Sequence, residues 1–327
     1  MSPQTSYNQK DKSGRFSMEL KEIARNVYAC LQEDRGLGYS NAGLINSGGG
    51  MAVDTFWDLP HTREMMKLYA QVWKKPAPRV VNTHHNGDHC WGNQLFEGAE
   101  IIAHRECARR FQGESLVTQI KNLPADAPAW LKGLAAALKD WDFSGVELTP
   151  PNRIIDGNMV IAQGEIEVHI IYVGPAHTAG DLLVHLPAER VLFAGDIIFR
   201  LCTPIGWEGT YAHWLKALDR IIALNPGVIV PGHGPLCGVE GARDMRAYFE
   251  HVYAEAWRFF GKGLSPLEAA KRIDLGPYAR WTEPERIIFN VHRAYREFQS
   301  MPFDAPIDRP TLFGEMAVLR ASRPGAR

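Results

Sequence analysis

The sequence has few of the features that mark a secreted or membrane-embedded protein. No run approaches the roughly 18 consecutive apolar residues of a membrane-spanning helix. The polar N-terminus also lacks the apolar core of a secretory signal. The five cysteines are scattered and odd in number, and none forms a Cys-x-x-Cys pair, which disfavours a disulfide framework. We therefore expect a cytoplasmic protein with reduced thiols and no membrane partner.

A strong excess of charge of one sign is also missing. Lysine and arginine total 36 residues and aspartate and glutamate total 37, which gives a formal net charge of −1. We therefore expect no basic surface that attracts nucleic acid. With 45% hydrophobic and 22% charged residues, the chain can bury a sizeable core. The expected partner is a small-molecule substrate, and the composition does not specify an oligomeric state.

Hydrophobic patterning divides the chain into three parts. Residues 1–18 are polar and are expected to form a disordered leader. Residues 19–241 alternate short apolar strands with turns and helices, which is typical of an α/β catalytic domain. A helical pattern over about 105–148 interrupts these strands and is interpreted as an insertion. Residues 242–327 are expected to form a helical C-terminal extension.

The C-terminal extension carries two helix-start signals and a set of basic residues. Ser265 with Glu268 and Thr282 with Glu285 each match the capping-box pattern. We interpret the basic residues as a solvated face. The alternative is a pocket for an anionic carrier, such as the coenzyme part of a thioester. These basic residues are Lys271, Arg272, Arg280, Arg286, Arg293 and Arg296.

The segment VNTHHNGDHCWGN, residues 81–93, carries a high density of potential metal ligands. Three histidines and one aspartate fall between residues 84 and 89. They directly follow the short apolar strand predicted over residues 78–83, so they lie on a loop at the end of a strand. On a tight loop such side chains can converge on one point. They are His84, His85, Asp88 and His89.

Three further candidates lie at the ends of apolar strands later in the chain. His177 occurs in GPAHTAGD between two strands, Asp196 ends the strand RVLFAGD, and His233 ends the strand VIVPGHG. Glycines flank these positions and allow the backbone to approach a ligand closely. Imidazole and carboxylate groups together suit Zn²⁺, Fe²⁺ or Mn²⁺. The sequence therefore predicts a metal centre.

This ordered pattern resembles the metallo-β-lactamase superfamily, whose signature is HxHxDH followed by a distant His, Asp and His. The resemblance covers roughly residues 22–241 and implies an αββα sandwich with the metals at one edge. It also implies one complete metal site, formed by Asp88, His89 and His233 with Asp196 bridging to a second site. The second site would use His84 and His177, but here Asn86 stands where the family has a histidine.

Asn86 leaves two interpretations open. Its amide oxygen could bind the metal, although a neutral amide is a weaker zinc ligand than imidazole. Otherwise His84, His177 and Asp196 alone form two histidines and one carboxylate, the ligand set of non-haem Fe(II) oxygenases. Members of the same superfamily that oxidise persulfides resemble that arrangement. A catalytically silent metal- or ligand-binding module is the third hypothesis.

We favour hydrolysis, because the site formed by Asp88, His89, His233 and Asp196 is complete and an oxygenase would not need it. The expected enzyme binds one or two Zn²⁺ ions per chain, with Fe²⁺ as the alternative. Zinc supplies hydroxide from bound water at neutral pH. The expected substrate bond is an ester, lactone, thioester or related bond. By resemblance, Asp88 orients the nucleophile or transfers a proton.

Residues around the cluster are expected to support it or to line the pocket. Asp54 ends a strand and resembles a family position that supports the metal loop. His85 is expected to point away from the metals. Trp57, Trp91 and Trp207 flank the ligand segments, so they are candidates for an apolar wall, which would favour a partly apolar substrate.

Overall fold

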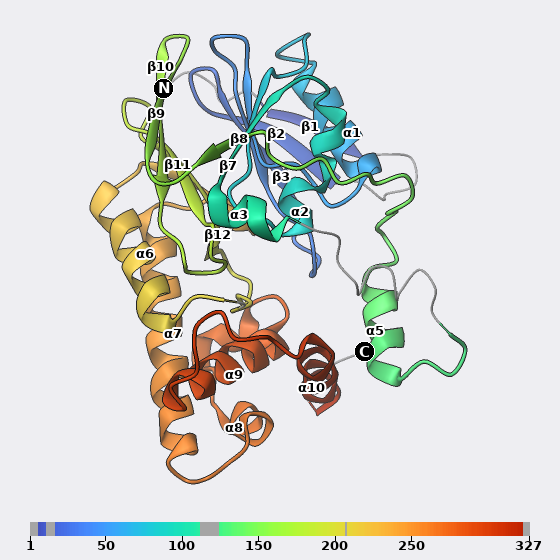
Figure 1. Cartoon of the computed structure of the whole chain (residues 1–327), viewed down its shortest axis with the longest axis vertical. Coiled ribbons are helices and arrows are strands. Elements are labelled where there is room, and N and C mark those ends of the chain that lie inside the picture. Colours follow the sequence, from blue (N-terminus) through green and yellow to red (C-terminus); the bar gives the residue numbers. More distant parts are fainter. Residues whose placement is uncertain (1–5, 11–16, 112–123, 207, 323–327) are drawn as a thin grey trace.

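A computed structural model of the chain describes residues 6–10, 17–111, 124–206 and 208–322. Two β-sheets lie face to face, and helices cover both outer faces (Figure 1). The first sheet is eight-stranded and keeps its strands in chain order, antiparallel up to the fifth strand and parallel from there on. Its strands are β1 (Ser6–Lys10), β2 (Ser17–Ala24), β3 (Val27–Gln32), β4 (Ala42–Ile45), β5 (Met51–Val53), β6 (Arg79–Val81), β7 (Glu100–His104) and β8 (Arg153–Ile155).

The second sheet is five-stranded, in the order β13-β12-β11-β10-β9. Its pairs are antiparallel except for β12 with β13, which are parallel, so the two strands that lead to Asp196 and His233 end at the same edge. Its strands are β9 (Met159–Gln163), β10 (Ile166–Tyr172), β11 (Leu182–Leu186), β12 (Val191–Phe199) and β13 (Val228–His233).

Apolar side chains from both sheets fill the space between them and form one layer of the core. Val53, Val81 and Ile102 of the first sheet pack with Phe193 and Val230 of the second, and all five are buried. Burial of this apolar surface holds the two sheets in fixed register relative to each other. This matters for function because the ligand candidates come from both sheets.

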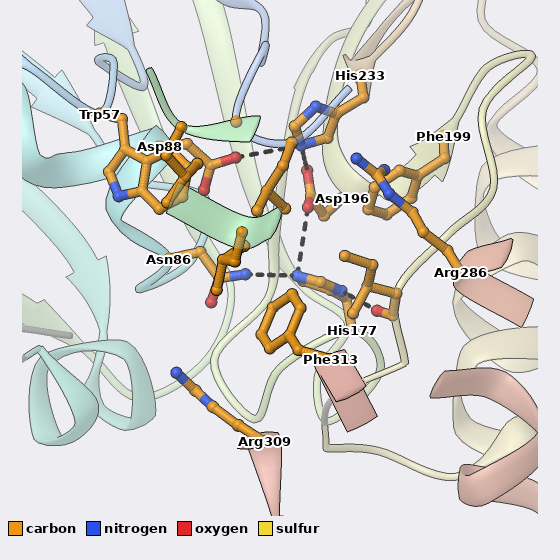
Figure 2. A pocket seen from close by; sticks show the side chains of 15 residues that line it. Trp57, Asn86, Asp88, His177, Asp196, Phe199, His233, Arg286, Arg309 and Phe313 are labelled. Carbon is orange, nitrogen blue, oxygen red and sulfur yellow. Dashed lines mark hydrogen bonds and ion pairs between the residues drawn. The ribbon is translucent and has the colours of Figure 1, made fainter. Parts of the chain in front are cut away.

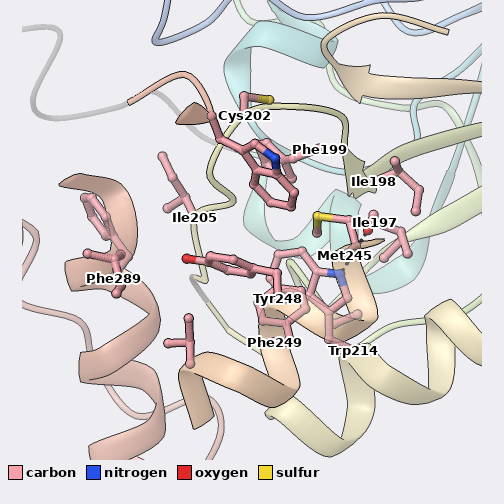
Figure 3. Close-up of a cluster of buried hydrophobic side chains, with 14 of the residues drawn as sticks. Ile197, Ile198, Phe199, Cys202, Ile205, Trp214, Met245, Tyr248, Phe249 and Phe289 are labelled. Atoms are coloured by element: carbon pink, nitrogen blue, oxygen red, sulfur yellow. Dashed lines mark hydrogen bonds between the residues drawn. The ribbon is translucent and has the colours of Figure 1, made fainter. Parts of the chain in front are cut away.

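Helices complete the sandwich on both sides. Helix α1 (Leu59–Tyr69) buries Met65 and Leu68 against the outer face of the first sheet. Helices α6 (Tyr211–Leu224) and α7 (Val239–Phe260) cover the second sheet, where Figure 3 shows Trp214 and Met245 packed beneath Ile197. The predicted αββα sandwich is therefore confirmed.

The predicted insertion and extension lie together at one end of the molecule. Between β7 and β8 the described residues form α3 (Arg105–Arg110) and α5 (Ala129–Ala137). After α7 come α8 (Pro266–Arg272), α9 (Ile287–Phe298) and α10 (Arg309–Ser322). Figure 1 shows α5 and α10 side by side below the sheets, and the two helices are in contact.

The sequence signals at the helix starts had different outcomes. Ser265 and Glu268 form the predicted capping box at the start of α8. Thr282 does not cap α9: Glu283 adopts a left-handed backbone conformation, with φ of 48°, and a short 3₁₀ turn, η3 (Pro284–Arg286), leads into the helix. That second prediction was wrong, because Glu283 and Glu285 both pair with Arg320 of α10 instead.

The solvated-face interpretation of the basic residues was wrong for two of them. Arg286 and Arg293 are only 2% and 5% exposed. Arg286 pairs with Glu283, and Arg293 donates to the carbonyl oxygen of Phe303. A buried guanidinium needs such partners, because an unpaired buried charge is very costly.

The segment expected to be a disordered leader, residues 1–18, contains β1 and the first residues of β2, which pair with each other. The predicted boundary at residue 241 falls inside α7, because this helix already begins at Val239. The division into a catalytic domain and a helical extension stays a prediction. Within the described residues, no helix is both long and apolar enough to cross a membrane.

Close approach of the two sheets depends on a glycine. A Cβ atom on Gly43 of β4 would lie 2.0 Å from the ring of Phe193 in β12. We expect Gly43→Val to lower the free energy of unfolding by about 1–3 kcal/mol, because overpacking forces core side chains out of their preferred rotamers. Denaturant unfolding measures this. The matched control is Gly157→Ala, where the added Cβ has no neighbour within 4 Å; an equal loss in both variants would contradict the packing argument.

Candidate metal centre

The candidate ligands meet at one edge of the sandwich, where loops from both sheets come together (Figure 2). The first sheet contributes the loop after β6 and the one-turn helix α2 (Gly87–Cys90). The second sheet contributes the β10–β11 loop and strands β12 and β13. The register of β12 is irregular around Gly195, so the strand departs from regular pleating next to Asp196.

Asp196 lies between two pairs of histidines. Its Oδ2 is 3.3 Å from Nε2 of His177 and 3.7 Å from Nε2 of His84. Its Oδ1 is 3.0 Å from Nε2 of His89 and 3.4 Å from Nε2 of His233. One buried carboxylate therefore faces four imidazoles, an arrangement suited to a ligand that bridges two cations.

The potential ligands form two groups of three. One group is His84, His177 and Asp196, and the other is Asp88, His89 and His233; within each, one nitrogen or oxygen atom per residue lies within 4.8 Å of the others. In the second group, Oδ2 of Asp88 is 3.4 Å from Nε2 of His233. The sequence-predicted ligands are thus brought together in the two sets that the family resemblance implied.

The outward-facing nitrogen of each histidine is held by another group. Nδ1 of His177 is 2.8 Å from the carbonyl oxygen of Ile205, and Nδ1 of His233 is 3.0 Å from that of Tyr39. A carbonyl oxygen only accepts, so these Nδ1 atoms carry a proton and the Nε2 atoms face the pocket. Nδ1 of His89 lies 3.0 Å from Asp54.

Asp54 occupies the supporting position that the sequence predicted. Besides His89, its carboxylate accepts from the backbone N–H of Thr83 at 2.7 Å and from the Thr83 hydroxyl at 2.8 Å. The Thr83 hydroxyl also lies 3.0 Å from Nδ1 of His84. Asp54 has a φ of 61°, an uncommon conformation for a non-glycine residue. One buried carboxylate therefore fixes the loop that carries His84 and His89.

Asn86 lines the pocket beside His177. Its side-chain nitrogen is 2.9 Å from Nε2 of His177, the atom that would bind a metal in this group (Figure 2). Because Nδ1 of His177 already carries a proton, Nε2 accepts this hydrogen bond from the amide. Asn86 must give up the contact before His177 can bind a metal.

Asp196 dominates the electrostatics of the pocket: it outweighs burial, raises the pKa of His233 to about 9 and raises that of His89 well above its ordinary value. Burial lowers the pKa of His84 well below its ordinary value and also lowers that of His177, so both imidazoles are neutral and free to act as ligands. Burial acts to raise the pKa of Asp196, but His233 and His89 outweigh it and hold that pKa well below its usual range. The carboxylate therefore stays ionised.

Unpartnered atoms test whether these residues fit a metal. Nε2 of His84 is buried without a hydrogen-bond partner, and Nε2 of His89 and Oδ1 of Asp196 lie 3.0 Å apart without the geometry of a hydrogen bond. Leaving buried polar atoms unpaired is costly, and a bound cation would satisfy all three. Nitrogen and carboxylate ligands of this kind suit zinc, so the residues present fit the metal that the sequence predicted.

The remaining predicted residues lie at different distances from the centre. Trp57 lines the pocket, whereas Trp91 packs behind it with ring centroids 6.4 Å apart. His85 belongs to neither ligand group. Burial lowers its pKa to about 3, so it is a neutral supporting side chain. Trp207 lies outside the described residues.

Sequence reasoning missed a set of pocket and support residues. Ser40 donates its hydroxyl to the carbonyl oxygen of Asp88 at 2.6 Å, and Asn41 donates to the carbonyl oxygens of Pro231 and Gly234 on either side of His233. No motif marks these positions, because they follow from the packing of β4 beside β13. The pocket residues missed are Leu37, Leu134, Leu138, Phe199, Ile205, Arg286, Arg309 and Phe313.

Comparison with known proteins agrees with this geometry. The family model described as the metallo-beta-lactamase superfamily matches residues 35–233, more than half of the chain. A hydroxyacylglutathione hydrolase of Maricaulis maris is 26% identical over 274 residues, covering 82% of this chain and 79% of the relative. A linear primary-alkylsulfatase of Pseudomonas sp. is 22% identical, covering 70% of this chain and 49% of the relative.

Solved structures share the fold. An inverting sec-alkylsulfatase from Pseudomonas sp. has a TM-score of 0.65 at 19% identity, covering 88% of this chain and 51% of the other. A metallo-beta-lactamase from Pontibacter korlensis has a TM-score of 0.54 at 18% identity, covering 70% of this chain and 97% of the other. The chain therefore spans about half the length of both alkylsulfatases.

We expect Asp54→Ala to weaken zinc binding by about 10–100-fold, because loss of a group that orients a ligand typically costs that much. Asp54→Asn keeps one acceptor for Thr83 and should lose less. Competition with a chromogenic chelator measures both affinities. Thermal unfolding of the metal-free proteins distinguishes a loss of metal affinity from a loss of the folded structure. Unchanged zinc affinity in a folded Asp54→Ala protein would contradict the supporting role of Asp54.

The second expectation concerns Asn86. Asn86→His restores an imidazole beside His84 and His177, so zinc content should rise toward two ions per chain if the natural protein holds close to one. Elemental analysis of protein purified without added metal gives the stoichiometry. The conservative variant Asn86→Ala serves as control, since it removes the amide without adding a ligand. Equal zinc content in all three proteins would show that position 86 is not a ligand position.

Proposed function

The chain belongs to the metallo-beta-lactamase superfamily, and on that basis we propose that it is a metal-dependent hydrolase with two zinc sites. The observation that carries this proposal is the convergence of four imidazole Nε2 atoms and two buried carboxylates on one pocket. The proposed ligands are His84, His177 and Asp196 in one site, and Asp88, His89 and His233 in the other, with Asp196 shared and Asn86 beside the first.

The proposed reaction is hydrolysis of an ester, lactone, thioester or related bond. Water forms a bond to the acyl carbon, the bond from that carbon to the leaving heteroatom breaks, and the leaving group takes up a proton. Bound zinc would make water acidic enough to react at neutral pH and would polarise the carbonyl group. Relatives named for different hydrolytic activities support the general reaction class only.

Within this proposal the chain's own residues have distinct tasks. Asp88 lines the pocket with its carboxylate 3.4 Å from His233, where it can orient the attacking water and accept its proton. The walls of the pocket are largely apolar, with Trp57, Leu134 and Phe313 among them. Such walls exclude bulk water and strengthen the electrostatic interactions inside.

One observation favours a second candidate. His84, His177 and Asp196 by themselves provide two histidines and one carboxylate, and the nitrogen of Asn86 rather than its oxygen approaches His177. This set matches mononuclear Fe(II) oxygenases. The hydrolase remains the better proposal, because the group of Asp88, His89 and His233 would have no task in a one-iron enzyme.

Substitution of the second group tests the two candidates. We expect His233→Ala and Asp88→Ala to lower kcat/KM for ester or lactone hydrolysis at least a hundredfold, because each removes a ligand or a proton acceptor. The matched control is His169→Gln, a histidine in β10 away from the pocket, which should retain activity. An initial-rate assay over a panel of p-nitrophenyl esters, thioesters and lactones gives the readout.

Metal identity provides the independent measurement. Zinc in the purified protein with activity lost on chelation agrees with the hydrolase. The oxygenase would become the better proposal if the protein contains about one iron ion per chain, the His233→Ala variant retains this iron, and an oxygen electrode detects oxygen consumption. A panel without any turnover in the zinc-loaded protein would instead favour the third hypothesis, a binding module.

A further inference from the structure

A large groove adjoins the metal pocket. It has a volume of about 1330 Å³ and lies among α5, α8, η3 and α10. The metal pocket itself is much smaller, about 50 Å³. The two spaces share five lining residues, so they adjoin each other at these side chains. These shared residues are Leu37, Leu134, Ile205, Arg286 and Phe313.

The size difference restricts what can occupy the two spaces. A volume of about 50 Å³ admits the reacting group of a substrate and little more. A larger substrate therefore has to extend out of the metal pocket, and the groove adjoins that pocket at the shared residues. Four of those five residues are apolar, which favours a hydrocarbon portion of the substrate at this point.

Small side chains keep the outer groove open. Helices α5 and α10 meet where Trp130 packs near Gly314, whose added Cβ would lie 3.8 Å from the indole ring. Beyond this contact the walls are lined by residues too small to fill the space between the helices. They are Gly133, Ala137, Ala270, Ala279, Ala317 and Ala321.

Charged side chains of both signs line the groove, and those of η3 and α10 pair with one another. Arg320 pairs with both Glu283 and Glu285, and Arg286 pairs with Glu283. Two guanidinium groups line the metal pocket, that of Arg309 and, next to the groove, that of Arg286, as Figure 2 shows. Its Nη1 also donates to the carbonyl oxygen of Thr203 at 3.3 Å. A polar or anionic head would meet this cation, and an apolar tail would meet the small side chains.

We propose that the groove between α5 and α10 binds the unbranched acyl or alkyl chain of an amphiphilic substrate, whose reacting head enters the metal pocket past Arg286 and Phe313. The reaction in this inference rests on the proposed hydrolase function, but the binding of the substrate's hydrocarbon chain in the groove does not. Ala317 and Ala137 then determine specificity, since each lies where the chain would pass.

Binding is tested first, without turnover. The probe is dansylaminoundecanoic acid, whose fluorescence rises in an apolar site, titrated against the full-length protein. We expect saturable binding of the probe at one site. Ala317→Trp and Ala137→Trp should each weaken this binding at least tenfold, because the indole ring would occupy the part of the groove where the probe's hydrocarbon chain lies. Val318→Trp is the matched control, because Val318 adjoins Ala317 in α10 but is 44% exposed and lies outside the groove.

Two results of the titration would overturn the proposal. One is the absence of saturable binding to the natural protein, and the other is equal affinity in folded Ala317→Trp, Ala137→Trp and Val318→Trp. The circular dichroism spectrum and the melting temperature identify any variant that fails to fold. Because the two groove variants lie on separate helices, one of them can still be tested if the other does not fold. A His233→Ala protein should bind the probe normally, which separates the groove from the metal chemistry.

Turnover is tested second, with p-nitrophenyl acetate, butyrate and octanoate. Each buried methylene group should raise kcat/KM about fourfold, so the octanoate, with four more methylene groups, should exceed the butyrate by about two-hundredfold. Ala317→Trp should abolish that difference, whereas Val318→Trp should keep it. Hydrolysis that does not depend on chain length would overturn the groove proposal while the hydrolase stands. Probe binding without hydrolysis of any ester would support the groove proposal and overturn the ester hydrolase. Release of sulfate from octyl sulfate would then identify a sulfate ester as the reacting head group of the substrate.

Discussion

The buried carboxylate of Asp196 is the group on which the metal centre depends. It is in contact with imidazoles from both sheets, so its position fixes the distance between the two ligand groups. Two glycines make this position available. A Cβ atom on Gly232 would lie 2.0 Å from Oδ1 of Asp196, and one on Gly195 would lie 2.7 Å from the hydroxyl oxygen of Thr83. The glycines that precede Asp196 and His233 are therefore packing requirements of the centre.

The centre is held by a layer of polar contacts that the apolar core encloses. Asp54 orients the loop of the first sheet, and backbone carbonyls orient His177 and His233. Each contact fixes a ring nitrogen that does not face the pocket, which leaves the facing nitrogen ready to bind. A bound cation would offset part of the free-energy cost of burying the polar atoms that have no partner.

The sequence predicted the parts of the molecule that depend on short-range patterns. Alternating apolar strands were enough to predict an α/β domain, and clustered histidines marked the ligand candidates His84, Asp88 and His89. The family resemblance added the αββα sandwich and the grouping of the ligand candidates. Contacts between distant segments could not be predicted. The pairing of Arg320 with Glu283 removed the expected helix cap at Thr282, and the burial of Arg286 follows from the meeting of η3 with α10. The same holds for Phe313 and Leu134, which reach the pocket from helices about 180 residues apart in sequence.

The effect of Asn86 on the metal site follows from comparing the free energy of its hydrogen bond with that of zinc binding. A hydrogen bond such as the one it donates to His177 contributes about 0.5–1.5 kcal/mol to stability. Binding of zinc to a set of protein ligands contributes about 10–16 kcal/mol, so the hydrogen bond is too weak to keep a metal out. The larger effect is the loss of one imidazole ligand, which lowers affinity without removing His84, His177 or Asp196. In the proposed zinc enzyme, Asn86 would therefore lower the occupancy of one site, while the group around His233 would keep its ligands.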